Sequence, residues 1–452
     1  MGLDFVNEEN MGMLTDLYEL TMCASYLDNK KNEPATFDLL IRKMPLNRSY
    51  FIFAGLEQVL LFLKNIRFTQ EQLDYLKKQG FKQEFLDYLK NFKFTGDVWA
   101  VPEGTIVFEN EPLIRVTAPI IEAQLIETFI INAVNVQTMV ATKASRVVHA
   151  ARGKSVVDFS LRRTHGTDAG MKVARACYIA GCAGTSNVLA GMNYGIPIFG
   201  TMAHSFVMLF DKEIDSFRAF VKTFPKTSTL LIDTYDDLKG AENAVIIAKE
   251  LEKNGFKLSG VRLDSGDLLS LSRKVRVLLD KKGLDYVKIF ASGDLDEFKI
   301  KELLDNNAKI DAFGVGTRMG TSHDKPSVDV VYKLCERMDN TGKFIPVIKL
   351  SKNKATLPGR KQVFRTDKDG FYEKDIIGLE GEKINGMPLL IKVMIKGEIV
   401  HDLPELEDIK KMTLENLSKL PEKYKKLKTA SNYPIGLSSK LKKLTKKLNK
   451  KY

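Results

Sequence analysis

Between about residue 120 and residue 325 the chain alternates strand-like apolar runs with helical segments, and this alternation constrains the fold more than any other feature. A long helical run over 121–150 leads into the strand VVDFS, and later strands alternate with helices such as AENAVIIAKELEKNG and LLSLSRKVRVLLDKKG. Parallel strands joined by helical crossovers produce this pattern, and the number of units favours a closed barrel over an open sheet. In such a barrel the active site lies at the C-terminal ends of the strands.

At 452 residues the chain exceeds what one ordinary core usually fills, so we expect two or more domains. Residues 1–120 mix helix and strand patterns, including a helix from Leu14 and another that Thr69 caps. Residues 121–325 form the α/β barrel with its catalytic loops. Residues 326–452 form C-terminal strands that pack on the N-terminal domain, followed by a basic helical tail.

Several strand-like runs end in small, polar or basic residues, which is typical of loops that hold an anion. These runs are DFSLRRTHG, GCAGTSNVLAG, YGIPIFGTMAHS, VRLDSGD, ASGD and GVGTRMGTS. In the last of them, three glycines would turn backbone N–H groups toward one point, and three hydroxyls would add donors: Gly314, Gly316, Gly320, Thr317, Thr321 and Ser322. A tight turn with helix capping is the alternative, and a phosphate site is favoured.

Charged residues at these strand ends carry the remaining candidate chemistry. In LDSGD, the carboxylates Asp264 and Asp267 suit metal binding, ribose hydrogen bonding or helix capping, and Arg262 could face the pocket or the barrel wall. Of Arg162 and Arg163, one should face the pocket; the sequence does not say which. His165 is interpreted as structural. His204, in GTMAHS, could act as an acid, a base or a phosphate acceptor, and the surrounding phosphate loops favour such a role.

Net charge is +12, but it gathers at the C-terminus, where residues 405–452 hold 14 lysines and 5 acidic residues. Leu441, Leu444 and Leu448 recur there at helical intervals, so a solvated amphipathic helix is favoured over a surface for nucleic acid or membrane. No signal-peptide pattern opens the chain, and no apolar run approaches 18 residues. The cysteines lack metal-site spacing, and we predict buried, reduced thiols in a cytoplasmic protein: Cys23, Cys177, Cys182 and Cys335.

Together these motifs resemble the nicotinate phosphoribosyltransferases, a family of type II phosphoribosyltransferases. The resemblance spans most of the chain and rests on TDLYELTM, DFSLRR, GTSNVLAG, GTMAHS, FPKTSTLLIDTYD, RLDSGD, ASGDLDE, FGVGTRMGTS and YPIGLSSKL. It implies an irregular (β/α) barrel of phosphoribosyltransferase type with an α+β N-terminal domain and a small C-terminal extension. It also implies NAD salvage, in which nicotinate and 5-phosphoribosyl-1-diphosphate give nicotinate mononucleotide and diphosphate. The resemblance further implies that ATP hydrolysis is coupled through a phosphohistidine, as in a ligase, and that Mg²⁺ is required.

The resemblance also implies roles for individual residues. Tyr18 would stack on nicotinate in the partner's site of a homodimer with shared active sites, and Phe159 would stack on the other face. His204 matches the phosphorylated histidine, between Thr201 and Ser205, which would border the substrates. Arg162 would contact the nicotinate or the phosphate, and Gly316 and Thr317 would contact the 5-phosphate. The phosphoribosyl and diphosphate groups would be bound by Arg262, Asp264, Gly293 and Asp294. No metal ligand is assigned, because Mg²⁺ is expected to be held mainly by the diphosphate.

Ser186 bears on the choice of substrate. Related nicotinamide-using enzymes have Asp after GT in the motif that matches GTSNVLAG, and this chain has Ser186. A carboxylate there would accept a hydrogen bond from an amide and repel an acid, so Ser186 favours nicotinate. Nicotinamide-using and quinolinate-using phosphoribosyltransferases remain the alternatives within enzymes. A protein that binds RNA or membrane on an inactive barrel is the alternative from another class; it predicts damaged motifs, and none is damaged.

Overall fold

The computed structural model describes residues 6–351 and 356–451, which fall into two compact units. One unit combines Met1–Thr142 with Ser327–Tyr452, and the other is Lys143–Pro326. Segment 121–142, which the sequence pattern grouped with the barrel, therefore belongs to the unit that holds both chain ends.

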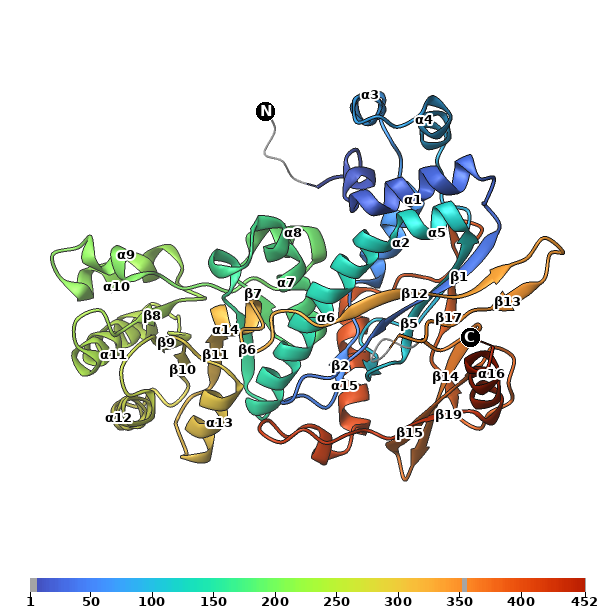
Figure 1. Cartoon of the computed structure of the whole chain (residues 1–452). Coiled ribbons are helices and arrows are strands. Elements are labelled where there is room, and N and C mark those ends of the chain that lie inside the picture. The colour runs from blue at the N-terminus through green and yellow to red at the C-terminus, as the bar shows by residue number, and fades with distance from the viewer. Residues whose placement is uncertain (1–5, 352–355, 452) are drawn as a thin grey trace. The chain divides into compact units, whose positions relative to one another are not determined.

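The unit Lys143–Pro326 is built on a six-stranded parallel sheet with the order β7-β6-β11-β10-β9-β8 (Figure 1). The strands are β6 (Ser155–Asp158), β7 (Gly184–Thr185), β8 (Thr229–Leu231), β9 (Gly260–Leu263), β10 (Lys288–Ala291) and β11 (Ala312–Val315). The α/β class with parallel strands and helical crossovers is thus confirmed. The ladder is open in the described residues, with β7 and β8 at its edges, and it is extended beyond β7 by a single bridge between Thr185 and Ile198.

Helices follow these strands, as the alternating pattern predicts. They are η2 (Leu161–Arg163), α7 (Thr167–Ile179), α8 (Val188–Tyr194), α9 (His204–Met208), α10 (Glu213–Thr223), α11 (Asp237–Lys253), α12 (Leu268–Lys281), α13 (Glu297–Asp305) and α14 (Thr317–Gly320). Side chains at the strand-to-helix turns cap α8, α11, α12 and α13 by accepting backbone N–H bonds: Asn187, Asp236, Asp267 and Asp296. The expected strand PIFG is reduced to the bridge at Ile198.

The other unit is dominated by a seven-stranded antiparallel sheet with the order β13-β12-β1-β5-β3-β17-β18. Its strands are β1 (Pro34–Ile41), β3 (Asp97–Ala100), β5 (Pro112–Pro119), β12 (Val330–Met338), β13 (Phe344–Pro346), β17 (Ile391–Ile395) and β18 (Glu398–Ile399). The interior strand β1 pairs with β5 and with β12, for example Phe37 with Val116 and Leu39 with Tyr332, so sequence-distant segments share one sheet.

Helices and smaller elements complete this unit. From the N-terminal half come η1 (Met11–Met13), α1 (Leu17–Asp28), α2 (Leu56–Asn65), α3 (Gln70–Lys78), α4 (Gln83–Lys90), the pair β2 (Phe51–Ile52) and β4 (Ile106–Val107), and α5 (Ile120–Leu125). Thr69 caps α3 in a reciprocal capping box with Gln72, as the sequence predicted for Thr69. The long helical run expected over 121–150 is broken at Ile126, after which α6 (Glu127–Ala150) is continuous.

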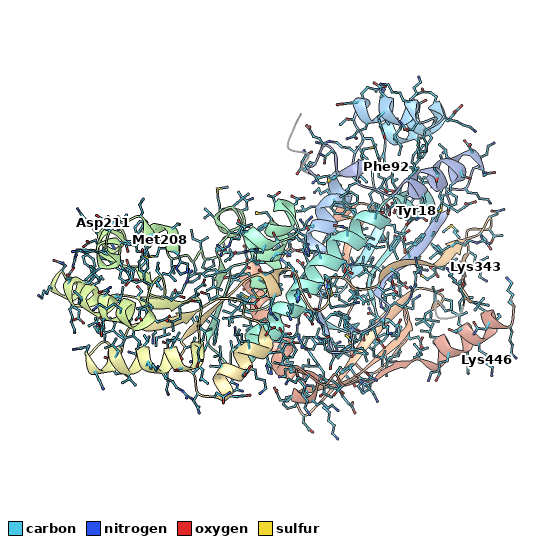
Figure 2. The ribbon with its side chains drawn as sticks, turned by 60° about the vertical axis from the view of Figure 1, so that its left-hand side comes forward. Tyr18, Phe92, Met208, Asp211, Lys343 and Lys446 are labelled. Carbon is cyan, nitrogen blue, oxygen red and sulfur yellow. The ribbon has the colours of Figure 1, made fainter. Side chains whose placement is uncertain are left out.

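The C-terminal segment adds a four-stranded sheet with the order β16-β14-β15-β19. The elements are β14 (Lys361–Lys368), β15 (Phe371–Leu379), β16 (Met387–Pro388), α15 (Leu406–Lys419), η3 (Glu422–Tyr424), β19 (Ile435–Leu437) and α16 (Ser439–Asn449). In α16, Leu441 and Leu448 are buried, whereas lysines such as Lys446 are exposed (Figure 2). The amphipathic interpretation of the basic tail is therefore confirmed.

Candidate active site

The candidate residues of the unit Lys143–Pro326 gather where its parallel strands end. Because carboxyl ends of parallel strands meet at one edge of a sheet, segments far apart in sequence are brought together there. The segments that follow β6, β8, β9, β10 and β11 begin at Phe159, Ile232, Asp264, Ser292 and Gly316, and most of the motifs singled out from the sequence lie in them.

Asp233 and Asp264 organise two neighbouring strand ends. Asp233 Oδ2 accepts hydrogen bonds from the Asp264 N–H (2.9 Å) and from Ser265 Oγ (2.7 Å). Asp264 Oδ1 in turn accepts one from Ser292 Oγ at 2.5 Å, which links the end of β9 to the end of β10. Asp233 was missed as a site residue, although the run TLLIDTYD contained it. An acidic residue just after a strand was the available signal.

Arg262 points from β9 toward the same group. Its Nη1 donates to Thr201 Oγ1 at 2.5 Å, and its Nη2 lies 3.6 Å from Asp264 Oδ1. Burial lowers the pKa of Arg262, and the nearby charges of Asp264 and Asp233 oppose that effect while Arg162 adds to it. Arg262 Nε is buried and has no hydrogen-bond partner in the described residues. The Arg262 guanidinium therefore keeps one N–H donor that could bind an anion.

His204 is the first residue of α9 and contacts two strand ends. Its Nδ1 lies 3.2 Å from Thr234 Oγ1, a hydrogen bond whose donor depends on the ring's tautomer. Its Nε2 lies 4.0 Å from Asp264 Oδ2, and the side chain is 40% exposed. The imidazole can therefore be oriented by protein groups and still be reached by a ligand. Thr234, like Asp233, was not anticipated.

Gly293 and Asp294 fold tightly over the end of β9. Gly293 has φ +91°, and a Cβ built on it would lie 1.8 Å from the carbonyl oxygen of Asp264, so only glycine fits. Asp294 makes a bidentate ion pair with Arg318 of α14, with both N–O distances at 2.8 Å. The hydrogen bond from Arg318 holds the pKa of the Asp294 carboxyl below its usual range. Arg318 also lies 3.1 Å from Asp296 Oδ2, and the sequence had not identified it as a site residue.

Close packing requires two of the glycines of GVGTRMGTS. Gly314, Gly316 and Gly320 all lie outside the positive-φ region. A Cβ on Gly314 would meet the Phe159 ring at 2.7 Å, and one on Gly320 would meet Ser160 at 2.2 Å, so these two are needed for close packing.

The hydroxyls of that loop are also partly committed to the backbone. Thr321 Oγ1 donates to the Thr317 carbonyl and Ser322 Oγ to the Lys325 carbonyl, whereas the Thr317 side chain is exposed at the start of α14. The hydroxyl donors predicted from Thr321 and Ser322 are therefore used within the loop.

At the end of β6, beside the edge strand β7, the buried Asp158 connects several segments through hydrogen bonds. It accepts hydrogen bonds from Ser160 N–H (2.9 Å), Ser160 Oγ (2.5 Å) and Thr185 Oγ1 (2.8 Å). Burial raises the pKa of Asp158, and these hydrogen bonds oppose the rise. Its carbonyl oxygen accepts from the Ser186 N–H, so Ser186 lies half-buried at the end of β6.

The half-buried ring of Phe159 lies at the same end of the sheet. Its centroid is 5.6 Å from that of Phe290, and its N–H donates to the Val315 carbonyl. Phe290 therefore packs against the Phe159 ring, which remains partly accessible. Arg162 and Arg163 are both exposed in η2, and Arg162 is the one that acts on the pKa of Arg262.

The remaining candidates divide as follows. Asp267 is the N-cap of α12 and accepts from the N–H groups of Leu269 and Ser270, which resolves its role in favour of capping. Ser205 is exposed on α9. Among the described residues, no group of three or more His, Cys, Asp or Glu side chains could hold a metal ion by itself. The four cysteines are buried free thiols, as predicted.

Tyr18 belongs to the unit that holds both chain ends, where it lies on α1 with 46% of its surface exposed (Figure 2). Burial of its hydroxyl, together with the charges of Glu127, Glu19 and Asp16, raises its pKa. The adjacent Glu19 is fully buried and accepts from Thr128 Oγ1 (2.6 Å), and burial raises its pKa to about 7. Tyr18 is thus an exposed aromatic ring on a firmly anchored helix.

Comparison with known proteins gives consistent results over nearly the whole chain. Family models match for the nicotinate phosphoribosyltransferase N-terminal domain (residues 13–135), the nicotinate phosphoribosyltransferase family (154–372) and its C-terminal domain (383–445). Nicotinate phosphoribosyltransferase pncB2 of Mycobacterium tuberculosis is 47% identical, covering 95% of this chain and 92% of its own. The Bacillus subtilis nicotinate phosphoribosyltransferase is 38% identical, covering 95% and 94%.

Solved structures agree with these sequence matches. Human nicotinic acid phosphoribosyltransferase superposes with a TM-score of 0.86 at 27% identity and covers 96% of this chain and 99% of its own. A nicotinate-nucleotide pyrophosphorylase of Pyrococcus furiosus superposes with a TM-score of 0.74 at 28% identity, covering 93% and 99%. None of the helices in the described residues is long and apolar enough to cross a membrane.

Proposed function

The chain belongs to the nicotinate phosphoribosyltransferase family, and on that premise we propose that it transfers phosphoribosyl to the ring nitrogen of nicotinate and couples this transfer to ATP hydrolysis through His204. The observation that carries the coupling is the placement of His204 between Thr234 and Asp264, a carboxylate whose other oxygen lies 3.6 Å from Arg262 Nη2. The imidazole is exposed to ligands, is oriented by neighbouring strand ends, and shares Asp264 with an arginine.

The chemistry of the coupling follows from the two ring nitrogens. With the proton on Nδ1, donated to Thr234 Oγ1, the lone pair is on Nε2. Nε2 forms a bond to the γ-phosphorus of ATP as the bond to the bridging oxygen breaks, and ADP leaves with that electron pair. Water later hydrolyses the phosphohistidine. The added phosphate changes the charge beside Arg262 and Asp264, so the two enzyme forms bind substrates with different affinity.

In the phosphoribosyl transfer, departure of diphosphate leaves positive charge at the anomeric carbon of the ribose. We assign nicotinate to the face of the Phe159 ring that does not pack against Phe290, with Ser186 nearby, because an aromatic face positions a planar ring without adding charge. Arg262 and Arg162 would stabilise the leaving diphosphate, and the start of α14 at Gly316 and Thr317 would hold the 5-phosphate. Asp264 and Gly293 would border the ribose, since their backbones are in direct contact.

The residues present fit a Mg²⁺ ion that is held mainly by the diphosphate. Mg²⁺ takes oxygen ligands, and Asp264 and Asp233 offer carboxylates at neighbouring strand ends. Asp233 Oδ1 is buried and accepts no hydrogen bond in the described part of the chain, so it has an unused acceptor for a cation or its water. When bound, Mg²⁺ would neutralise charge that develops on the leaving diphosphate.

A homodimer with shared active sites is supported by an uncharged surface around the site. Residues 176–210 contain no Asp, Glu, Lys or Arg, although they include Ser186, Thr201 and His204. Large apolar side chains on α8, α9 and the loop between them are exposed: Val188, Leu189, Met192, Ile198, Phe199, Met208 and Leu209. Exposed apolar patches of this kind mark interaction sites. We assign this face to a second copy of the chain, whose α1 presents exposed Leu17 and Tyr18.

Subunit mixing tests the shared site. Tyr18→Ala and Asp264→Ala chains, each inactive alone, should regain activity when their subunits exchange, because one site of the hybrid contains neither change. Leu209→Asp, which puts a charge on the apolar face, should shift the dimer toward monomer in sedimentation. Absence of recovery after verified exchange would count against the shared site. We also propose a cytoplasmic location, which the four buried free thiols support.

One assay tests the activity and its coupling together. Nicotinate mononucleotide formation is measured with nicotinate, nicotinamide and quinolinate, each with and without ATP, and nicotinate with ATP should be fastest. With γ-labelled ATP, an acid-labile label should appear on the wild type and be lost in His204→Ala. That variant should keep slow transfer that ATP no longer stimulates. His165→Ala, which removes another exposed histidine of the same unit, is the matched control and should retain the label. A label that persists in His204→Ala would identify another acceptor.

A further inference from the structure

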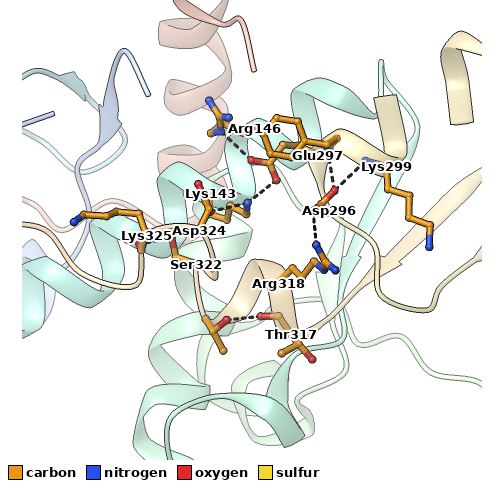
Figure 3. A network of polar contacts seen from close by, with 12 residues as sticks. Lys143, Arg146, Asp296, Glu297, Lys299, Thr317, Arg318, Ser322, Asp324 and Lys325 are labelled. Carbon is orange, nitrogen blue, oxygen red and sulfur yellow. Dashed lines mark hydrogen bonds and ion pairs between the residues drawn. The ribbon is translucent and has the colours of Figure 1, made fainter. Parts of the chain in front are cut away.

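A buried ionic cluster lies beneath the two loops that we expect to hold the phosphate end of the substrate (Figure 3). Glu297, the first residue of α13, is fully buried, and its Oε1 lies 3.1 Å from Arg146 Nε and its Oε2 lies 2.6 Å from Lys143 Nζ. Lys143 Nζ also lies 2.7 Å from Asp324 Oδ1, in the segment after α14. Lys143 therefore joins the start of α13, where the loop after β10 ends, to the segment after α14, which continues from the loop after β11.

A second ionic link joins the same two loops at the surface. Arg318 of α14 pairs with Asp294 and also with Asp296, which caps α13 through the N–H groups of Phe298 and Lys299. Asp296 and Glu297 are adjacent in sequence, so the surface link and the buried link hold the same turn. Figure 3 shows Arg318 and Lys143 reaching this turn from different elements.

The energetic cost of burying charge makes this arrangement informative. A buried ion pair gains little stability over apolar residues of the same size, whereas loss of one partner leaves a charge uncompensated in the interior. The best-documented role of buried polar or ionic groups is to favour one arrangement of the surrounding segments over others. Here the geometry that they specify is the relative position of Gly293–Asp294 and Gly316–Thr317, the residues assigned to the phosphoribosyl group.

We infer that Lys143 and Glu297 are positioning residues that hold the loops after β10 and β11 in register for the phosphate end of 5-phosphoribosyl-1-diphosphate. This inference rests on the proposed function of those loops. Neither side chain touches the substrate. Both act through the turn Asp294–Glu297 and through Asp324, so their loss should weaken binding of the phosphoribosyl substrate and leave nicotinate binding unchanged.

Two substitutions separate this role from general stability. Glu297→Gln keeps the shape of the side chain and removes its charge. Asp324→Asn removes only the second partner of Lys143, at a position whose side chain is 20% exposed, and should fold even if Glu297→Gln does not. Both should raise the KM for 5-phosphoribosyl-1-diphosphate tenfold or more, with the KM for nicotinate within twofold of the wild type. Asp305→Asn, which breaks exposed ion pairs with Arg152 and Lys301 at the far end of α13, should change neither KM.

The outcomes distinguish this inference from the proposed site. If Thr317→Val raises the KM for 5-phosphoribosyl-1-diphosphate while folded Asp324→Asn and Glu297→Gln leave it within twofold, the site stands and the positioning role is overturned. If Thr317→Val also leaves that KM unchanged, the phosphate assignment itself fails. A purely structural role predicts a lower melting temperature and a smaller active fraction, with both KM values unchanged, and that result would also overturn the inference.

Discussion

Substitution of Gly293 by Ala tests how closely the loop after β10 must approach Asp264. The new Cβ would lie 1.8 Å from the Asp264 carbonyl oxygen, whereas such contacts are essentially never under 3.0 Å, so the loops must separate by at least ~1.2 Å. Misplacement of reacting groups by about 1 Å can cost about 100-fold in rate. We therefore expect kcat/KM to fall about 100-fold, which corresponds to about 2.7 kcal/mol of transition-state stabilisation. Steady-state kinetics with both substrates at saturating ATP measures this loss.

Gly80 provides the matched control for backbone strain. It has the same φ of +91°, but a Cβ built on it meets no atom within 4 Å. Both alanine variants should lose about 1–3 kcal/mol of stability from the unfavourable φ, and only Gly293→Ala should lose activity beyond its folded fraction. A Gly293→Ala enzyme that keeps kcat/KM within threefold of Gly80→Ala would refute the argument, because the contact with Asp264 would then be dispensable.

Three further results are expected. Burial raises the pKa of Glu19 in the folded protein to about 7, so the folded state binds a proton there more tightly than the unfolded chain does. The resulting stabilisation of the folded state is complete at pH values below the ordinary glutamate pKa, and it is lost as pH rises through 7. Denaturant unfolding at pH 5 and pH 8 should therefore show a loss of up to about 3 kcal/mol in the wild type that Glu19→Gln does not show. Ser186→Asp should lower kcat/KM for nicotinate tenfold or more by repelling its carboxylate, and an unchanged value would remove Ser186 from the base pocket. Asp233→Ala should lower kcat/KM at least tenfold, whereas Asp267→Ala, which removes only a helix cap, should cost about 1 kcal/mol of stability and little activity.

The sequence predicted the strand-end motifs because local patterns encode them. The alternation of strands and helices identified the parallel sheet, and small polar residues after VVDFS, GVRLD and DAFGVGT marked the edge where Phe159, Asp264 and Gly316 lie. Helix caps were also readable, since Thr69 precedes an amphipathic run. The sequence did not show that β7 and β8 would remain unpaired with each other at the two edges of the sheet, because closure depends on strand tilt and stagger around the whole barrel.

The residues that sequence reasoning missed are those whose role arises only through tertiary contacts. The local sequence around Arg318 shows only a polar residue in a glycine-rich loop, and its partner Asp294 is 24 positions away. Lys143 and Glu297 are separated by 154 positions and have no local signature. The packing role of Gly314 and Gly320 was also not predictable, because a sequence shows that a side chain is absent but not whether conformation or close packing requires its absence.

The charge balance of the site bears on how it can hold a polyanion. Charged side chains near the strand ends include Arg162, Arg163, Arg262 and Arg318 against Asp233, Asp264, Asp294 and Asp296, so the acidic groups at least offset the basic ones. Arg318 is already neutralised by Asp294 and Asp296, and Arg262 is shared between Thr201 and Asp264. A substrate that carries a 5-phosphate and a diphosphate would therefore meet little net positive charge from side chains. This balance would suit a division of labour in which Mg²⁺ neutralises the diphosphate, the start of α14 holds the 5-phosphate through backbone N–H groups of Gly316 and Thr317 and the Thr317 hydroxyl, and the carboxylates accept hydrogen bonds from ribose hydroxyls.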